Sequence, residues 1–176
     1  MTRLLPLLII GLLALVPALA AAQEAGGQSA ERVVERPGTS GLALPRFVSL
    51  RAAEVNLRTG PGVRYPIDWV YRRRGLPVEV IDEFEGWRRI RDHEGTIGWV
   101  HQSMLGGRRF GLVQDSEPVL RREPEAGAPG VARLAPGVIG RLEGCDRDWC
   151  RLEVQGYSGW LQRTALFGLY PDEILR

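Results

Sequence analysis

The sequence contains no lysine, and it has only two cysteines and two histidines among its 176 residues. Without lysine, a Schiff-base enzyme or a lysine isopeptide bond is excluded, because no side-chain amine is available. Basic and acidic side chains nearly balance, at 23 and 21, so we expect no concentrated cationic face and no nucleic-acid partner. No long stretch has the apolar period of an amphipathic helix. The absence of a helical pattern favours an all-β protein.

The first residues form the one long apolar run. Arg3 is followed by the apolar stretch 4–16 and by two closely spaced Ala-x-Ala sites, a pattern typical of a secretory signal peptide over residues 1–22. An uncleaved membrane anchor is the alternative, because the run approaches the length that spans a bilayer. We expect export to the periplasm or the exterior, with no stable membrane anchor after cleavage. Residues 23–43 are rich in Gly, Ala, Ser and charge, which predicts a flexible leader.

A duplication dominates the rest of the chain, because residues 56–105 are repeated at 119–166. The matched pairs include Leu57 and Leu120, Pro61 and Pro124, Trp87 and Trp149, and Trp99 and Trp160. The period is longer than the roughly 20–50 residues of solenoid and propeller units. Each copy is therefore a candidate small domain.

Turn signals rich in Gly, Pro and Asp divide the first copy into short segments with strand-like alternation. We expect strands at 47–50, 54–58, 67–71, 76–81, 87–91 and 96–100, and one helical turn at 101–105. So many strands in so short a segment suggest a small β-barrel, since closure removes exposed sheet edges. The predicted boundaries are 44–106 for the first barrel, 107–118 for a linker, 119–170 for the second barrel and 171–176 for a tail. We expect the matched tryptophans Trp87, Trp99, Trp149 and Trp160 to supply much of the two cores.

The first copy contains Asn56-Leu57-Arg58-Thr59-Gly60-Pro61, then Gly86-Trp87, Asp92 and Gly98-Trp99. This string resembles the bacterial SH3 (SH3b) domain family, and the second copy is similar to it through Leu120-Arg121, Trp149 and Trp160. The resemblance implies two tandem SH3-like β-barrels. It also implies a non-catalytic module, often one that targets the cell wall or a peptide. Asn56 and Asp92 are expected to brace loops.

The two cysteines, Cys145 and Cys150, align with Glu83 and Arg88 of the first copy. Residues of opposite charge suit cross-strand neighbours, and an exported protein favours disulfides, so a structural disulfide is predicted. A redox-active pair and a metal site are the alternatives, but the spacing is not Cys-x-x-Cys. With both thiols used, no cysteine nucleophile remains for catalysis. We therefore expect no enzymatic activity, no metal and no cofactor, and an atypical hydrolase stays a remote alternative.

Three aromatic residues of the first copy, Tyr65, Trp69 and Tyr71, have no aromatic counterpart in the second. They are candidates for stacking on a ligand, with Arg58 and Arg72 contacting anions or carbonyl groups. Packing against the second barrel is the alternative interpretation. The sequence thus predicts a binding protein for a cell-wall peptide or an envelope protein. The competing hypothesis is a scaffold in which the two barrels form one rigid unit without a small ligand.

Overall fold

The computed structural model describes residues 36–114 and 117–176. The expected signal peptide, residues 1–22, and the first part of the expected leader lie outside the described residues. Within the described part, no helix is long and apolar enough to cross a membrane. The two helices found there are single 3₁₀ turns, η1 (Gln102–Met104) and η2 (Arg163–Ala165). The prediction of an all-β protein is confirmed.

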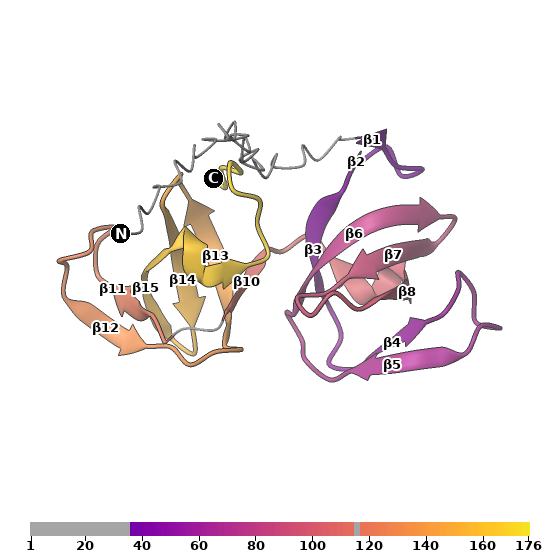
Figure 1. Cartoon of the computed structure of the whole chain (residues 1–176), viewed down its shortest axis with the longest axis horizontal. Helices are drawn as coiled ribbons and strands as arrows, with labels where there is room; N and C mark the ends of the chain where they lie inside the picture. Colours follow the sequence, from indigo (N-terminus) through magenta and orange to yellow (C-terminus); the bar gives the residue numbers. More distant parts are fainter. Residues whose placement is uncertain (1–35, 115–116) are drawn as a thin grey trace, which may run out of the picture. The chain divides into compact units, whose positions relative to one another are not determined.

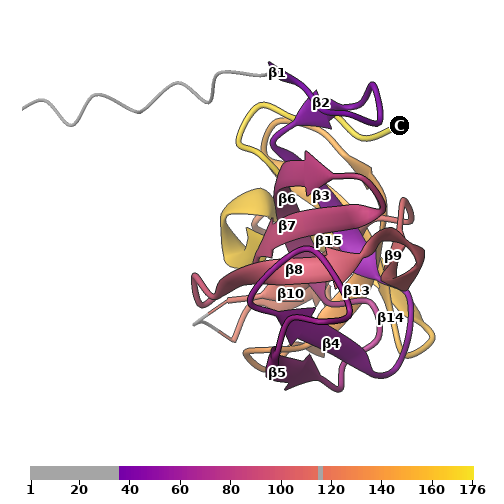
Figure 2. The ribbon, with the colours of Figure 1, turned by 90° about the vertical axis from the view of Figure 1, so that its right-hand side faces the viewer.

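The first domain is one antiparallel sheet of seven strands in the order β5-β4-β8-β7-β6-β3-β9 (Figure 1). Its strands are β3 (Arg46–Leu50), β4 (Val55–Arg58), β5 (Ile67–Tyr71), β6 (Pro77–Phe84), β7 (Trp87–Arg91), β8 (Ile97–His101) and β9 (Leu105–Gly106). Figure 2 shows β6, β7 and β8 side by side, as their pairing requires. The predicted strands 67–71 and 87–91 have the observed bounds, and the helical turn η1 follows β8 as expected.

The second domain repeats this topology element by element, in the order β12-β11-β15-β14-β13-β10-β16. Its strands are β10 (Phe110–Val113), β11 (Val119–Arg121), β12 (Gly130–Arg133), β13 (Ile139–Cys145), β14 (Trp149–Val154), β15 (Tyr157–Gln162) and β16 (Leu166–Phe167). The repeated sequence is therefore a repeated fold, with one strand of the second sheet for each strand of the first.

A glycine turn shows how closely the two copies correspond. The amide of Gly75 donates to the carbonyl of Leu50, and the amide of Gly137 donates to that of Val113, both at 2.8 Å. Gly75 has φ +82° and Gly137 has φ +79°, a left-handed conformation that glycine adopts without steric cost. The matched glycines therefore occupy the same turn before the long central strand of each sheet.

The cores of both domains are aliphatic rather than aromatic. Completely or nearly completely buried residues of the first include Leu44, Leu57, Val78, Val80 and Ile90. The second core is built mainly from leucines and valines and includes the cystine. The expectation that tryptophans fill the cores is wrong, because the four matched tryptophans are only partly buried. Alternation along the interior strands is the reason, because buried residues such as Ile90, Val100 and Leu161 occupy the inner face. The tryptophans of the same strands therefore fall on the other face.

The boundaries of the ordered parts differ from those expected. Strand β10 lies inside the segment expected to be a linker, residues 107–118, and pairs with β13 and β16. The expected leader, residues 23–43, ends in a two-stranded hairpin of β1 (Arg36–Pro37) and β2 (Ala43–Leu44). Within the expected tail, residues 171–176, Leu175 forms a bridge with Cys145.

The contacts between the two domains include aromatic rings and one buried carboxylate. The ring of Phe47 in β3 lies 5.2 Å from that of Phe167 and 4.8 Å from that of Tyr170. The hydroxyl of Tyr170 donates to Oε1 of Glu79 at 2.8 Å. Arg91 pairs with the other carboxylate oxygen of Glu79 at 2.6 Å. An apolar contact and a hydrogen-bonded buried carboxylate thus join β3 and β6 of the first domain to β16 and the segment that follows it.

Candidate functional site

Hydrogen bonds from the side chain of Arg58 hold the loop between β4 and β5 in one conformation. Nη1 of Arg58 donates to the carbonyl oxygens of Val63 and Tyr65 at 3.2 and 2.7 Å. The ring of Tyr65 packs against the backbone of Gly60, where a Cβ would lie 2.4 Å from the ring. Arg58 therefore stabilises the conformation of this loop, and the N–H donors of its Nη1 atom are already bonded to carbonyl groups of the loop.

An open groove of about 590 Å³ runs between this loop and the turn joining β6 and β7. Its apolar walls are Val63 and Phe84, whose surfaces are 80 % and 50 % exposed, together with the partly buried Trp87. Arg64 and Glu85 line it as well. Large apolar side chains exposed in a concavity are typical of a binding surface.

His101, at the end of β8, closes one side of this groove. Its ring meets that of Trp87 edge to face, with centroids 5.4 Å apart. The backbone amide of Ser103 points to Nδ1 at 3.4 Å, and the hydroxyl of Ser103 lies 2.8 Å from the same atom. If Nδ1 accepts from the amide, the neutral ring carries its proton on Nε2. Nε2 is then a donor beside the apolar walls.

The structure does not bring the five predicted ligand-binding residues together. Trp69 is 57 % exposed on β5, whereas Tyr71 at the end of that strand is 5 % exposed and part of the first core. Arg72 is exposed and pairs with Glu54 at 3.6 Å. Among the contacts described between the domains, neither Trp69 nor Tyr71 takes part.

Tyr71 belongs to a buried polar contact within the first domain. Its hydroxyl donates to Oδ2 of Asp92 at 2.8 Å, while Oδ1 of Asp92 accepts from the amides of Glu94 and Thr96 at 3.0 and 2.9 Å. Burial, and then the hydrogen bond to Asp92, raises the pKa of Tyr71 far above its ordinary value. Asp92 thus holds the turn between β7 and β8, whereas Asn56 is an exposed residue of β4.

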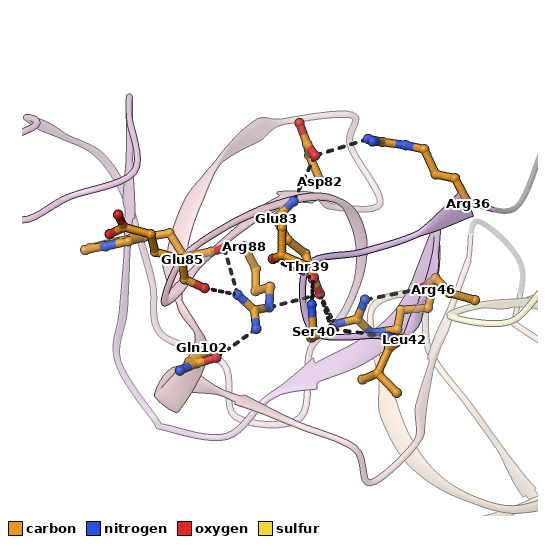
Figure 3. A network of polar contacts seen from close by, with 12 residues as sticks. Arg36, Thr39, Ser40, Leu42, Arg46, Asp82, Glu83, Glu85, Arg88 and Gln102 are labelled. Carbon is orange, nitrogen blue, oxygen red and sulfur yellow. Dashed lines mark hydrogen bonds and ion pairs between the residues drawn. The ribbon is translucent and has the colours of Figure 1, made fainter.

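A network of polar contacts in the first domain is centred on Glu83 (Figure 3). Its carboxylate, with no exposed side-chain surface, pairs with Arg46 at 2.7 Å and with Arg88 at 3.2 Å. It also accepts from the amide and hydroxyl of Ser40 at 2.7 and 2.8 Å, and from the hydroxyl of Thr39 at 3.2 Å. Glu83 therefore fastens the hairpin 36–44 to the first domain.

The charged pair aligned with the cysteines occupies the same place in the fold. Glu83 faces Arg88 across β6 and β7, and Cys145 faces Cys150 across β13 and β14. The Cys145–Cys150 disulfide is present, with the two Cα atoms 4.1 Å apart, so this prediction is confirmed. Among the described residues, no cluster of three or more His, Cys, Asp or Glu side chains is arranged to hold a metal ion.

Comparison with models of known protein families identifies the fold of both repeat copies. The family model described as the bacterial SH3 domain matches residues 51–107 and again residues 114–168. The chain belongs to the bacterial SH3 domain family. The predicted resemblance and the tandem arrangement are confirmed.

Solved structures with low similarity to these bacterial SH3 domains include NlpC2 from Trichomonas vaginalis and an NlpC/P60 family protein from Bacillus cereus ATCC 10987. The first is 13 % identical, with a TM-score of 0.33 and coverage of 70 % of this chain and 48 % of its own. The second is 14 % identical, with a TM-score of 0.32 and coverage of 69 % and 55 %. The chain spans about half the length of these structures. No curated protein matches it.

The second bacterial SH3 domain has a groove at the matching place, of about 520 Å³. Ala126 stands at the position of Val63, and Gln162 at that of His101. Trp149 matches Trp87, but Arg147 and Asp148 replace the Glu-Gly of the first turn. The second groove therefore keeps the tryptophan, but it has the smaller Ala126 in place of Val63 and no aromatic residue in place of Phe84.

The groove residues Val63, Phe84 and His101 are absent from the sequence-based prediction. Phe84 aligns with Asp146 of the second copy, so the criterion that selected Tyr65, an aromatic without an aromatic counterpart, would have found it as well. No comparable signal marks Val63 or His101, because they come from other loops and meet only in the folded domain.

Proposed function

We propose that the chain is an exported, non-catalytic binding protein whose first SH3 domain recognises an extended peptide of the cell envelope. The peptide belongs either to peptidoglycan or to a protein partner. The observation that carries this proposal is the exposed apolar groove formed by Val63, Phe84 and Trp87. The matching groove of the second domain lacks the first two of these apolar residues.

The chemistry of the groove suits an extended peptide. Aromatic rings supply flat apolar area at little cost in side-chain entropy, while Arg64 and Nε2 of His101 supply donors for peptide carbonyl oxygens. The internal bonds of Arg58 fix the loop before a ligand arrives, which lowers the ordering cost of binding. Arg58 and Tyr65 then act by positioning the loop.

Export rests on the signal-peptide pattern of residues 1–22 and is consistent with the disulfide, since such bonds persist in oxidising compartments. The proposal that the protein is non-catalytic is based on the sequence. Both cysteines are joined in the disulfide, which leaves no thiol nucleophile.

The test is retention of the purified protein on purified peptidoglycan and on an array of immobilised envelope peptides. Phe84→Asp introduces the residue that the second domain has at the aligned position, Asp146, and is expected to abolish retention. Trp69→Ala, which lies outside the groove, and Tyr157→Ala, at an exposed aromatic of the second domain, should bind as the wild type does. Equal retention of Phe84→Asp and wild type, or loss of retention only in Trp69→Ala, would refute the groove as the peptide-binding site. Wild-type failure on every surface would refute envelope binding.

A second candidate function is that of a scaffold, and the contacts of Phe47 and Glu79 with the second domain favour it. If the domains form one rigid unit, ¹⁵N relaxation will give both the same rotational correlation time. Separate correlation times would contradict the scaffold and leave the groove hypothesis intact.

A further inference from the structure

A second hollow, of about 430 Å³, lies where β3, the turn after β5 and the segment after β9 meet. Three arginines line it, namely Arg51, Arg74 and Arg108, together with Ser49 and Phe110. None of its lining residues lines the peptide groove. No acidic side chain is among them, so the hollow concentrates positive charge in a nearly neutral chain.

The three guanidinium groups have no partner within residues 36–114 and 117–176. Their neighbours do find partners, since Arg72 pairs with Glu54 and Arg73 donates to the carbonyl of Gly137. Like charges gathered in one concavity repel each other and raise the local potential for anions. The side chains themselves are exposed, so they are free to turn toward a ligand.

Ser49 provides the second observation. The residue is 3 % exposed, and its hydroxyl has no hydrogen-bond partner among the described residues. A buried hydroxyl without a partner is destabilising, and such a group is uncommon in folded proteins. An oxyanion held by the arginines would supply the acceptor that this hydroxyl lacks.

The walls of the hollow are fixed by backbone hydrogen bonds. The amide of Gly75 donates to Leu50 at 2.8 Å, and the amide of Arg51 donates to Met104 at 2.7 Å. Phe110 packs beside Gly75, where a Cβ would lie 3.3 Å from its ring. A rigid concavity of this kind orders few groups when a ligand binds.

We propose that this hollow is a binding site for an anionic ligand that carries two or more carboxylate or phosphate groups. Guanidinium groups bind both oxyanions through paired N–H donors, and three of them around one cavity suit a ligand with more than one charge. The site is independent of the peptide groove and gives the protein a second recognition chemistry.

The experiment is calorimetric titration of the full chain at low ionic strength with two probes, citrate as a tricarboxylate and pyrophosphate as a phosphate. Saturable binding of either probe is expected. Arg74→Gln with Arg108→Gln should weaken it by about tenfold or more. Arg122→Gln, at an exposed arginine of the second domain, is the matched control and should leave binding unchanged.

Ser49→Ala distinguishes a ligand contact from a structural role. Removal of an unpartnered hydroxyl should leave the melting temperature of the free protein unchanged or raise it, while affinity for the probe falls about threefold to tenfold. Binding of citrate alone would identify a carboxylate ligand, and binding of pyrophosphate alone a phosphate ligand. The proposal is overturned if neither probe binds, or if Arg122→Gln reduces affinity as much as the paired substitutions in the hollow.

Discussion

Replacement of Glu83 by glutamine tests how the first domain holds its N-terminal hairpin. Burial by itself would raise the pKa of Glu83, but hydrogen bonds from Ser40 and Arg46 and the charge of Arg88 outweigh it and lower the pKa from 4.5 to about 2. A difference of this size corresponds to about 3 kcal/mol in favour of the folded, ionised state. Glu83→Gln keeps the shape of the side chain and removes that charge.

The sign of the pH dependence follows from the lowered pKa. The stabilisation is fully present above the unfolded pKa of 4.5, and it disappears as the pH falls through 2. At pH 7 we expect Glu83→Gln to lower the free energy of unfolding by about 3 kcal/mol, and roughly half of that difference to remain at pH 3. Urea titrations of wild type and variant at both pH values measure the difference directly.

Two further measurements make the result specific to the network. Hydrogen exchange of the amides in residues 36–44 should accelerate in Glu83→Gln, because the hairpin is bound to that carboxylate through Thr39 and Ser40. Asp82→Asn is the control, because it keeps the Oδ1 atom that accepts from the amide of Glu83 at 2.9 Å. It removes only the charge of the exposed pair with Arg36, which should contribute less than about 0.5 kcal/mol. A stability difference that stays constant between pH 7 and pH 3 would show that charge is not the cause, and the reasoning would fail.

Two other predictions concern the covalent and steric features of the sheets. Replacement of Cys145 and Cys150 by serine should lower the free energy of unfolding by about 2 kcal/mol, the chain-entropy value for so short a loop, and equal urea midpoints for variant and wild type would contradict this. Gly98→Ala should cost at least about 2 kcal/mol because its Cβ would lie 2.5 Å from Cγ of Leu57. Gly95→Ala, at φ +85° with nothing within 4 Å, should cost only about 1–2 kcal/mol, and the reverse order in thermal unfolding would refute the packing argument.

Much of the fold could be predicted because the signals are local. Alternation within 67–71 and 87–91 and the glycine turns between strands gave the observed elements, and the repeat placed Cys145 opposite Cys150 through its counterpart pair. The hairpin 36–44 has no such signal, because its order depends on hydrogen bonds to Glu83, distant in sequence. Strand β10 was missed because two arginines and two glycines around Phe110 resemble a linker until the strand pairs with β13.

The candidate site was less accessible to sequence reasoning. Trp69 and Tyr71 lie two residues apart on β5, yet Trp69 is 57 % exposed, whereas Tyr71 is buried and bonded to Asp92. Arg72 follows the end of the strand and pairs with Glu54. The groove instead joins Val63 with Phe84 from another turn. Such a surface forms only where loops that are distant in sequence come together in the folded domain. Neither the periodicity nor the spacing of residues in the sequence predicts that contact.

The ion pair of Glu83 with Arg88 and the disulfide of Cys145 with Cys150 also constrain how duplicated copies can diverge. An exchange between the two arrangements needs two substitutions, and either one alone leaves a lone thiol beside a buried charge that lacks an ionic partner across the two strands. Loss of one partner from a buried pair costs about 3–5 kcal/mol, much of the stability of a small domain. A protein that changes from one arrangement to the other by single substitutions therefore passes through an unstable intermediate. Mutations at these paired positions are expected to be strongly epistatic.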